Sequence, residues 1–136
     1  MDQALPSLFR AMRINGDRPA ICQINCCLGV RHGEPDANDV ILDSNGFLHP
    51  GTGGLSVVPD DPHHLPRHRL PRELGGDGKH PLWVISSAAI SEPLTYTPDG
   101  GAAPRHGQIE PTAPMLLEEY RDHVAGTQPL WEVHAQ

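Results

Sequence analysis

The fold is decided by the run GQIEPTAPMLLEEYRDHVAG, residues 107–126, which joins a strand pattern to the strongest helix pattern of the chain. Its first five residues predict a short strand. Four later apolar side chains recur at helical spacing: Leu116, Leu117, Tyr120 and Val124. Pro114 suits the first turn of a helix over 114–125, Thr112 can cap it and Gly126 ends it. The run therefore predicts a strand followed by one amphipathic helix.

Short strand patterns outnumber this helix in the rest of the sequence. They are apolar or β-branched runs bounded by Pro, Gly or turn residues. The predicted strands are 8–12, 20–24, 39–42, 47–49, 55–58, 82–87, 94–97 and 130–133, the last being either a strand or a docked tail. Residues 43–46 predict a hairpin turn, residues 59–80 a long surface loop with short turns, and residues 94–97 a strand beside 82–87. A single α+β domain over 1–136 follows.

Composition narrows the class of protein. The 136 residues include 14 glycines and 15 prolines, about a fifth of the chain, which predicts a loop-rich domain with a modest core. Prolines exclude a helical bundle, and the length excludes a TIM barrel. No apolar run is long enough for a membrane span. Because Met1-Asp2-Gln3 lacks the basic start of a signal peptide, a cytoplasmic protein is expected.

Charge argues against a nucleic-acid binder. The chain carries 17 acidic and 10 basic residues, a formal net charge of −7. A phosphate-binding surface for nucleic acid would normally appear as a basic stripe. The nearest stretch, residues 63–72, is interrupted by prolines. Binding of nucleic acid is therefore not expected.

Metal-ligating residues occur without a recognisable metal pattern. The three cysteines, Cys22, Cys26 and Cys27, are an odd number, which fits no closed disulfide framework and favours a reduced cytosolic setting. They are interpreted as small apolar core residues, since no paired C-x2-C supports zinc. The loop histidines are interpreted as solvated: His63, His64, His68 and His80. No metal site is predicted.

The first candidate site combines Arg10 with the Gly53-Gly54-Leu55-Ser56 segment. An arginine inside an apolar strand costs desolvation unless a carboxylate or phosphate pairs with it. A glycine pair lets the backbone approach a ligand closely, and Ser56 can bind a ribose hydroxyl or fix the arginine. The alternative is an edge arginine pointing to water beside an ordinary turn, which spacing alone favours.

The second candidate is His106 with Glu110. Residues i and i+4 of a strand share a face, so both side chains can look into one cleft. A carboxylate there can bond a sugar hydroxyl in an oxocarbenium-like transition state. The alternative is a surface carboxylate before a proline turn. The dinucleotide fingerprint, the P-loop and the G-x-S-x-G elbow are absent, which argues against hydride-transfer Rossmann enzymes, P-loop NTPases and hydrolases with that elbow.

Three segments in this order carry a family resemblance. They are Leu8-Phe9-Arg10-Ala11, Thr52-Gly53-Gly54-Leu55-Ser56-Val57, and the 106–111 segment His-Gly-Gln-Ile-Glu-Pro with Pro114-Met115 after it. Together they resemble the small ADP-ribosyltransferase-like toxins, whose type is an NAD-dependent effector of bacterial type VI secretion. The matched segments cover about a fifth of the chain, and each motif alone is weak.

The resemblance implies a split, mostly antiparallel β core with an NAD cleft. It implies that Arg10 contacts the NAD phosphates or the adenosine ribose, and that Ser56 supports the nicotinamide ribose pocket. Three further residues would shape that pocket: Thr52, Gly53 and Gly54. Glu110 would stand at the place of the catalytic acid, and His106 matches the block that this toxin group shares.

The expected activity is cleavage of NAD, as a substrate, with ADP-ribose passed to an unknown acceptor or to water. The resemblance implies a toxin delivered into a target cell without a signal peptide, with a cognate immunity protein as partner. Two alternatives stay open. One is a non-enzymatic acidic binding or immunity-type protein, because a charge of −7 steers basic partners. The other is a protein that binds NAD or a nucleotide without turnover.

Overall fold

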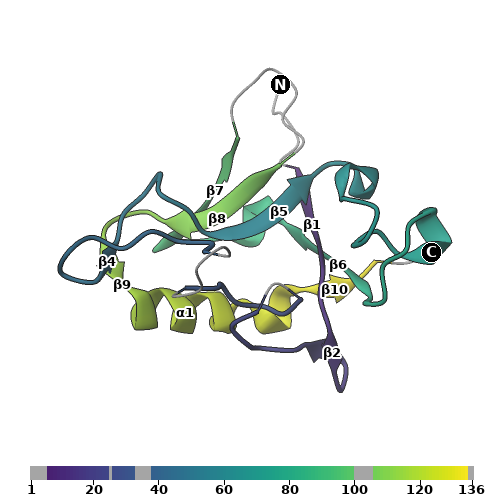
Figure 1. Cartoon of the computed structure of the whole chain (residues 1–136), viewed down its shortest axis with the longest axis horizontal. Helices are drawn as coiled ribbons and strands as arrows, with labels where there is room; N and C mark the ends of the chain where they lie inside the picture. The colour runs from purple at the N-terminus through teal and green to yellow at the C-terminus, as the bar shows by residue number, and fades with distance from the viewer. Residues whose placement is uncertain (1–5, 25, 33–37, 100–105, 135–136) are drawn as a thin grey trace.

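A six-stranded antiparallel sheet forms the centre of the protein, in a computed structural model that describes residues 6–24, 26–32, 38–99 and 106–134 (Figure 1). Its order is β10-β6-β1-β5-β8-β7, and every named strand pair is antiparallel. The strands are β1 (Ser7–Ala11), β5 (Leu55–Pro59), β6 (Leu82–Ser86), β7 (Leu94–Pro98), β8 (Gly107–Pro111) and β10 (Glu132–Val133). The predicted α+β class, with a mostly antiparallel sheet, is confirmed.

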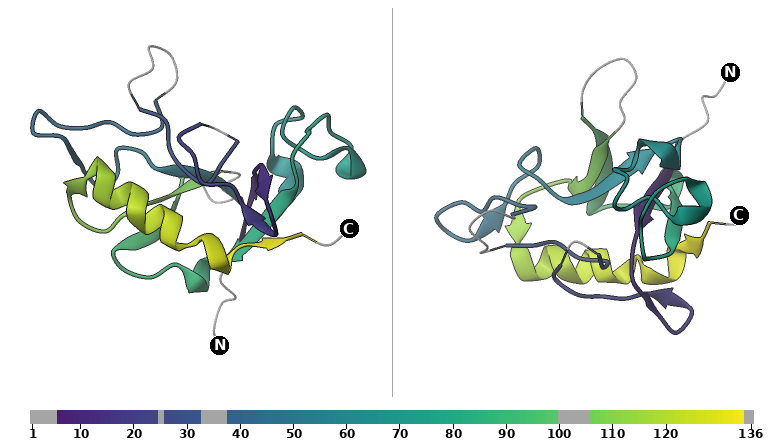
Figure 2. Two further views of the ribbon diagram at one scale, coloured as in Figure 1. Left: turned by 90° about the horizontal axis from the view of Figure 1, so that it is seen from below. Right: turned by 45° about the vertical axis from the view of Figure 1, so that its right-hand side comes forward.

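Smaller elements surround this sheet. Among the described residues, β2 (Ile14–Asn15) pairs with β3 (Arg18–Pro19) as a short hairpin, and β4 (Phe47–Leu48) pairs with the distant β9 (Met115–Leu116). The helix α1 (Leu117–Gly126) runs alongside one face of the large sheet (Figures 1 and 2). Four single 3-10 turns are η1 (Pro62–His64), η2 (Arg72–Leu74), η3 (Ser87–Ala89) and η4 (Gln128–Leu130). None of the helices in the described ranges has the length and hydrophobicity that spanning a bilayer would need.

The main core lies between the sheet and α1. It contains Tyr120 and Val124 of the helix and both tryptophans, Trp83 and Trp131. Each indole N–H is satisfied: Trp83 donates to the carbonyl of Met12 at 2.9 Å, and Trp131 donates to a threonine hydroxyl at 3.0 Å. Burying large aromatic surface against one helix compensates for the small number of regular elements.

The opposite face of the sheet carries a second, smaller cluster. Phe9, Val58 and Leu82 are buried there, and Leu65 and Leu74 of the 59–80 segment pack against them. The segment consists of turns and the two 3-10 turns η1 and η2, as predicted from its prolines and glycines. The long loop therefore has a structural function, because it covers apolar sheet surface that would otherwise face water.

The helix begins three residues later than predicted. Met115 and Leu116 continue as the strand β9, which pairs with β4 through Leu48↔Met115. Leu116 is the N-cap and provides no side-chain hydrogen bond, while Thr112 bonds the carbonyl of Pro93 instead of capping α1. Pro114 disfavours helical backbone in the residue before it. After Pro114, pairing with β4 keeps Met115 and Leu116 extended.

Three strand predictions were also wrong in part. Residues 20–24 form no strand, and of residues 39–42 only Leu42 makes a bridge, to Leu48. The 94–97 strand exists as β7 but pairs with β8, not with β6. Alternation of polar and apolar residues identifies which face of a strand is buried, but it does not specify the neighbouring strand.

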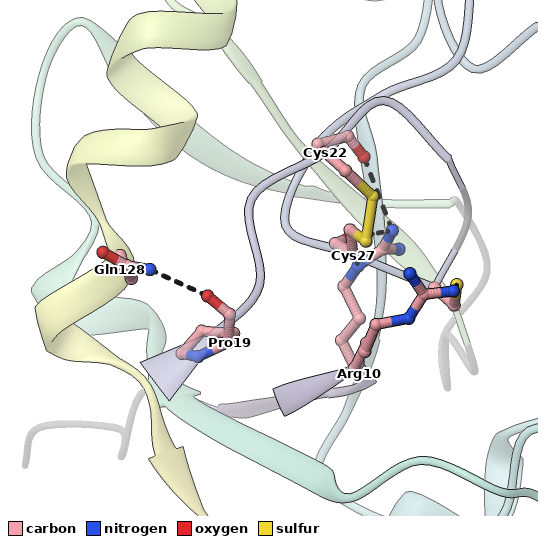
Figure 3. The surroundings of a disulfide bond; sticks show 8 residues. Arg10, Pro19, Cys22, Cys27 and Gln128 are labelled. Carbon is pink, nitrogen blue, oxygen red and sulfur yellow. Dashed lines mark hydrogen bonds between the residues drawn. A yellow bond between two sulfur atoms is a disulfide. The ribbon is translucent and has the colours of Figure 1, made fainter. Parts of the chain in front are cut away.

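The cysteine interpretation is corrected by a disulfide between Cys22 and Cys27 (Figure 3). With three cysteines not all can pair, but two of them can still form a disulfide with each other. The bend in this segment brings their Cα atoms to 5.4 Å, within disulfide reach. Of the described cysteines, Cys26 keeps a free thiol. The burial expected of a core cysteine is found only for Cys27, which is 0% exposed.

Candidate functional site

The candidate site is a cleft where β1 and β5 separate. These strands pair only through Leu8↔Pro59 and Phe9↔Val58. Past Phe9 and Val58 the two strands are no longer paired: β1 runs on to Ala11, and β5 extends back to Leu55. The unpaired ends form a fork. A cleft of about 190 Å³ lies at this fork, with Val57, Val58 and Leu65 among its apolar lining. We call it the fork cleft.

Arg10 fills the base of the fork cleft. Its side chain is 5% exposed, and it donates to the carbonyl oxygens of Cys27 at 2.9 and 3.2 Å, Gly29 at 3.5 Å and Ser56 at 2.9 Å. At Ser56 the backbones of β1 and β5 are not paired, and the guanidinium of Arg10 bonds the Ser56 carbonyl instead. Burial, and then the nearby charge of Arg69, lower the pKa of Arg10 to about 10. The group remains cationic at neutral pH.

Arg31 and Asp39 form an ion pair on the wall of the fork cleft. Arg31 Nη2 lies 2.9 Å from Oδ1 of Asp39, and Arg31 Nε lies 3.1 Å from Oδ2. The backbone N–H of Arg31 donates to the same Oδ2 at 2.7 Å. Hydrogen bonding to Asp39 raises the pKa of Arg31. This bidentate arrangement fixes the guanidinium beside the cleft.

The fork cleft is more basic than the chain as a whole. Arg10, Arg31 and Arg69 line it together with a single carboxylate, Asp39. The complete chain has a formal net charge of −7. A local excess of arginine on an acidic protein concentrates anions at one place on its surface. Sequence reasoning missed Arg31, Asp39 and Arg69, because no motif connects residues that meet only through loop folding.

Two further residues selected from the sequence also line the fork cleft. Ser56 is half-buried on β5, and His106 is half-buried directly before β8. The Nδ1 atom of His106 forms a hydrogen bond with the Oδ2 atom of Asp99, just beyond the end of β7. Arg10, Ser56 and His106 therefore meet at one cleft although 46 and 50 positions separate them.

Glu110 lies elsewhere. Its side chain is 5% exposed and does not line the fork cleft. Oε2 accepts from the backbone N–H of Gly51 at 2.8 Å, and Oε1 accepts from the hydroxyl of Thr97 at 2.7 Å. The carboxylate thus joins the 49–54 loop to β7. Although His106 and Glu110 are four residues apart, the structure does not place them in one cleft. The catalytic role of Glu110 stays a prediction.

The Thr52-Gly53-Gly54 segment packs against other parts of the protein. The Thr52 hydroxyl donates to the carbonyl of His49 at 2.7 Å. Gly53 has φ +135°, and a Cβ atom there would lie 2.3 Å from the carbonyl oxygen of Asp39; a Cβ on Gly54 would lie 2.4 Å from that of Ile109. The glycines let backbone approach backbone, and none of the three residues lines the fork cleft. Their binding of NAD stays a prediction.

Tyr120 of α1 fixes two of the strands near the fork cleft. Its hydroxyl donates to the carbonyl of Ile109 at 2.5 Å and accepts from the N–H of Leu55 at 2.9 Å. Burial raises the pKa of Tyr120. The hydroxyl connects α1 with β5 and β8, the strand that carries Ser56 and the strand that follows His106. From the sequence, Tyr120 was expected only as an apolar helix position.

No group of three or more His, Cys, Asp or Glu side chains in the described ranges is placed to hold a metal ion. The fold and the cleft define a class: a small α+β domain with an arginine-lined cleft in a forked antiparallel sheet. No protein-family model matches the chain, and no curated protein matches its sequence.

Proposed function

We propose that the chain is an ADP-ribosyltransferase-like toxin that binds NAD at the fork cleft and cleaves it. The observation that carries this proposal is the convergence of Arg10, Ser56 and His106 on one cleft. Each comes from a different one of the three sequence segments that resemble the toxin family. The fork between β1 and β5 also agrees with the split sheet that the resemblance implies.

The charges of the fork cleft suit a pyrophosphate. Arginines recognise phosphate oxygens through charge-assisted, often bidentate, hydrogen bonds. Arg10, Arg31 and Arg69 would bind the NAD pyrophosphate, and the hydroxyl of Ser56 would bond a ribose. Val57, Val58 and Leu65 offer apolar surface to a ring. A binding site of a few polar groups on an apolar lining is typical for small ligands.

The size of the site also bears on the proposal. Small-molecule pockets measure roughly 300–1,000 Å³, so the fork cleft alone would hold only part of NAD. A second cleft of about 360 Å³ shares Ala11 and Arg69 with it. We call it the adjoining cleft. We propose that a dinucleotide would extend from one cleft into the other across Arg69, which lines both.

The proposed reaction breaks the bond between the nicotinamide nitrogen and C1′ of its ribose. Nicotinamide leaves, and an acceptor nucleophile or water attacks the ribose cation and loses a proton. The His106–Asp99 pair at the cleft would take up this proton. Glu110 would stabilise the ribose cation, as a carboxylate does in glycoside chemistry. Because Gly51 and Thr97 hold its carboxylate outside the fork cleft, this role requires a rearrangement that breaks both hydrogen bonds and brings the carboxylate to the ribose.

A second candidate function is binding of NAD or a nucleotide without turnover. The hydrogen bonds of Glu110 to Gly51 and Thr97 favour it, because they hold the proposed catalytic carboxylate outside the fork cleft. A cognate immunity protein and, for the catalytic function, an acceptor of ADP-ribose are further proposals that follow from the toxin function.

The proposal is tested by incubating the purified chain with NAD, following nicotinamide release by chromatography and NAD binding by calorimetry. We expect the wild type to release nicotinamide and the His106→Asn variant to lose most of this activity. His49→Asn is the matched control, because His49 also pairs with an aspartate but lies outside the fork cleft. Binding without release would support the second candidate. Absence of binding and release would contradict both and favour a non-enzymatic acidic binding protein.

A further inference from the structure

The Cys22–Cys27 disulfide lies behind the arginine of the fork cleft. Figure 3 shows the Arg10 side chain reaching from β1 toward the two sulfur atoms. Three of its hydrogen bonds end on the segment that the disulfide closes or on the residues next to it, at the carbonyls of Cys27 and Gly29. Two residues whose carbonyls hold Arg10 thus lie at the disulfide or two residues after it, while a third, Ser56, lies on β5.

The described residues next to the disulfide pack tightly against each other. A Cβ atom on Gly29 would lie 1.8 Å from the carbonyl oxygen of Cys22, so this position requires glycine. The N–H of Leu28 donates to the carbonyl of Ala20 at 2.8 Å, and the N–H of Arg13 donates to that of Cys26 at 2.7 Å. Cutting the disulfide releases one end of this packing and loosens the acceptors of Arg10.

The two cysteines of the disulfide differ in their exposure to solvent. Cys22 is half-buried, whereas Cys27 is fully buried. An external thiolate would therefore attack the sulfur of Cys22, and Cys27 would leave as a thiolate. The neighbouring guanidinium of Arg10 favours this leaving group, because a cation stabilises a thiolate.

We propose that Cys22–Cys27 is a site of thiol–disulfide exchange that controls anion binding at the fork cleft. A dithiol attacks Cys22 and forms a mixed disulfide; its second thiol then displaces Cys22. The dithiol is oxidised to a disulfide, and Cys22 and Cys27 take up two electrons and two protons. With the loop opened, the N–H groups of Arg10 turn from the carbonyls of Cys27 and Gly29 to an anionic ligand.

Reduction is expected to strengthen anion binding, and the reason is the relative strength of the hydrogen bonds that Arg10 makes. In the oxidised protein an anion competes with carbonyls that are fixed beside Arg10. In the reduced protein it replaces mobile carbonyls, and hydrogen bonds between two charged groups are stronger than those to a neutral acceptor. The proposed function enters only through the identity of the anion, the pyrophosphate of NAD. The exchange itself applies to any phosphate ligand.

The experiment measures binding of inorganic pyrophosphate to the full chain, once oxidised and once reduced with dithiothreitol and exchanged into oxygen-free buffer. Alkylation and mass measurement check the state: one thiol when oxidised and three when reduced. We expect the Kd to fall about tenfold on reduction, the effect of one charged hydrogen bond. The double variant Cys22→Ser, Cys27→Ser should bind like the reduced wild type, while the control Cys26→Ser should keep the response.

Hydrogen exchange gives a second measurement that needs no variant. The amide of Leu28 should exchange faster in the reduced protein, because Leu28 directly follows Cys27 and its acceptor Ala20 lies two residues before Cys22. An equal Kd in both states, with the thiols confirmed, would overturn the inference. Should the double variant not fold, the wild-type comparison alone decides. Failure of nicotinamide release in both states would count against the proposed function and leave the pyrophosphate result standing.

Discussion

Arg10 is a buried charge that the described structure accommodates with backbone carbonyls. An isolated buried cation would be costly, and a carboxylate or phosphate is the usual partner. Here Cys27, Gly29 and Ser56 supply carbonyl oxygens from two separate segments. Arg10 therefore joins Cys27 and Gly29 to β5, and under the proposed function the same side chain would also bind the ligand.

Two tyrosines with buried hydroxyl groups provide a clean comparison. The hydroxyl of Tyr120 bonds both Ile109 and Leu55, whereas that of Tyr96 has no hydrogen-bond partner among the described residues. We expect Tyr120→Phe to lower the free energy of unfolding by about 2 kcal/mol, because two buried backbone groups lose their partner. Tyr96→Phe should be neutral or stabilising. Urea unfolding measures both, and equal losses would contradict this assignment.

Asp43 offers a test by titration. Hydrogen bonds from His49, and then from the backbone N–H groups of Phe47 and Asn45, lower the pKa of Asp43 below 3.8. Because the folded pKa is lowered, the carboxylate stabilises the fold above pH 3.8, and this contribution is lost as the pH falls through the folded pKa. We expect His49→Ala to raise the pKa of Asp43 in an NMR titration. An unchanged pKa would show that the backbone bonds alone cause the shift.

At the scale of elements, α1 starts without a side-chain cap. Leu116 occupies the N-cap position with extended backbone and is 41% exposed. Serine at an N-cap accepts a hydrogen bond from the first turn, whereas leucine cannot. The strand β9 ends at this same residue, so backbone pairing with β4 determines where the helix begins.

The variant Leu116→Ser should therefore raise the free energy of unfolding by about 0.5–1 kcal/mol. Thr112→Ala is the informative control, because the sequence predicts Thr112 as the cap while its hydroxyl bonds the carbonyl of Pro93. We expect this control to change stability by less than about 0.5 kcal/mol. Thermal unfolding measures both. A large loss in Thr112→Ala with no gain in Leu116→Ser would restore the predicted cap.

At the scale of the whole molecule, an acidic protein presents a basic cleft. The net charge is −7, yet three arginines and one aspartate line the fork cleft. Anion binding there should depend strongly on ionic strength, because salt screens charges that are partly exposed to solvent. Anions should also bind at the fork cleft in preference to other surfaces, since the negative charge of those surfaces repels them.

Arg69→Gln should weaken binding of inorganic pyrophosphate about tenfold in low salt, as expected for one charged contact. Arg72→Gln should change the Kd less than about twofold, because Arg72 is exposed and lines neither cleft. Calorimetry at low and high salt measures both variants. Equal effects of the two substitutions would show that any surface arginine contributes to anion binding, wherever it lies, and would contradict a specific site at the fork cleft.

Local sequence patterns predicted most elements of this fold. Apolar runs identified β1, β5, β6, β7 and β8, and helical spacing identified α1. The patterns did not predict which strands pair with each other. β7 pairs with β8 and not with β6, and residues 115–116 pair with β4 and do not join the helix. The candidate residues Arg10, Ser56 and His106 were found by motif, while Arg31 and Asp39 carried no signal, because they meet only through the folding of a loop.

The sequence by itself determined the α+β class, the strand faces and the segments that carry the candidate site. These properties depend on residue spacing along a short stretch of chain, which sequence patterns record directly. Only the tertiary structure decided that Arg10 bonds carbonyls, that Glu110 lies away from the fork cleft and that Cys22 pairs with Cys27. The physical reason is that a buried polar group takes whichever partner the packed chain brings within reach, and that partner can lie anywhere in the sequence.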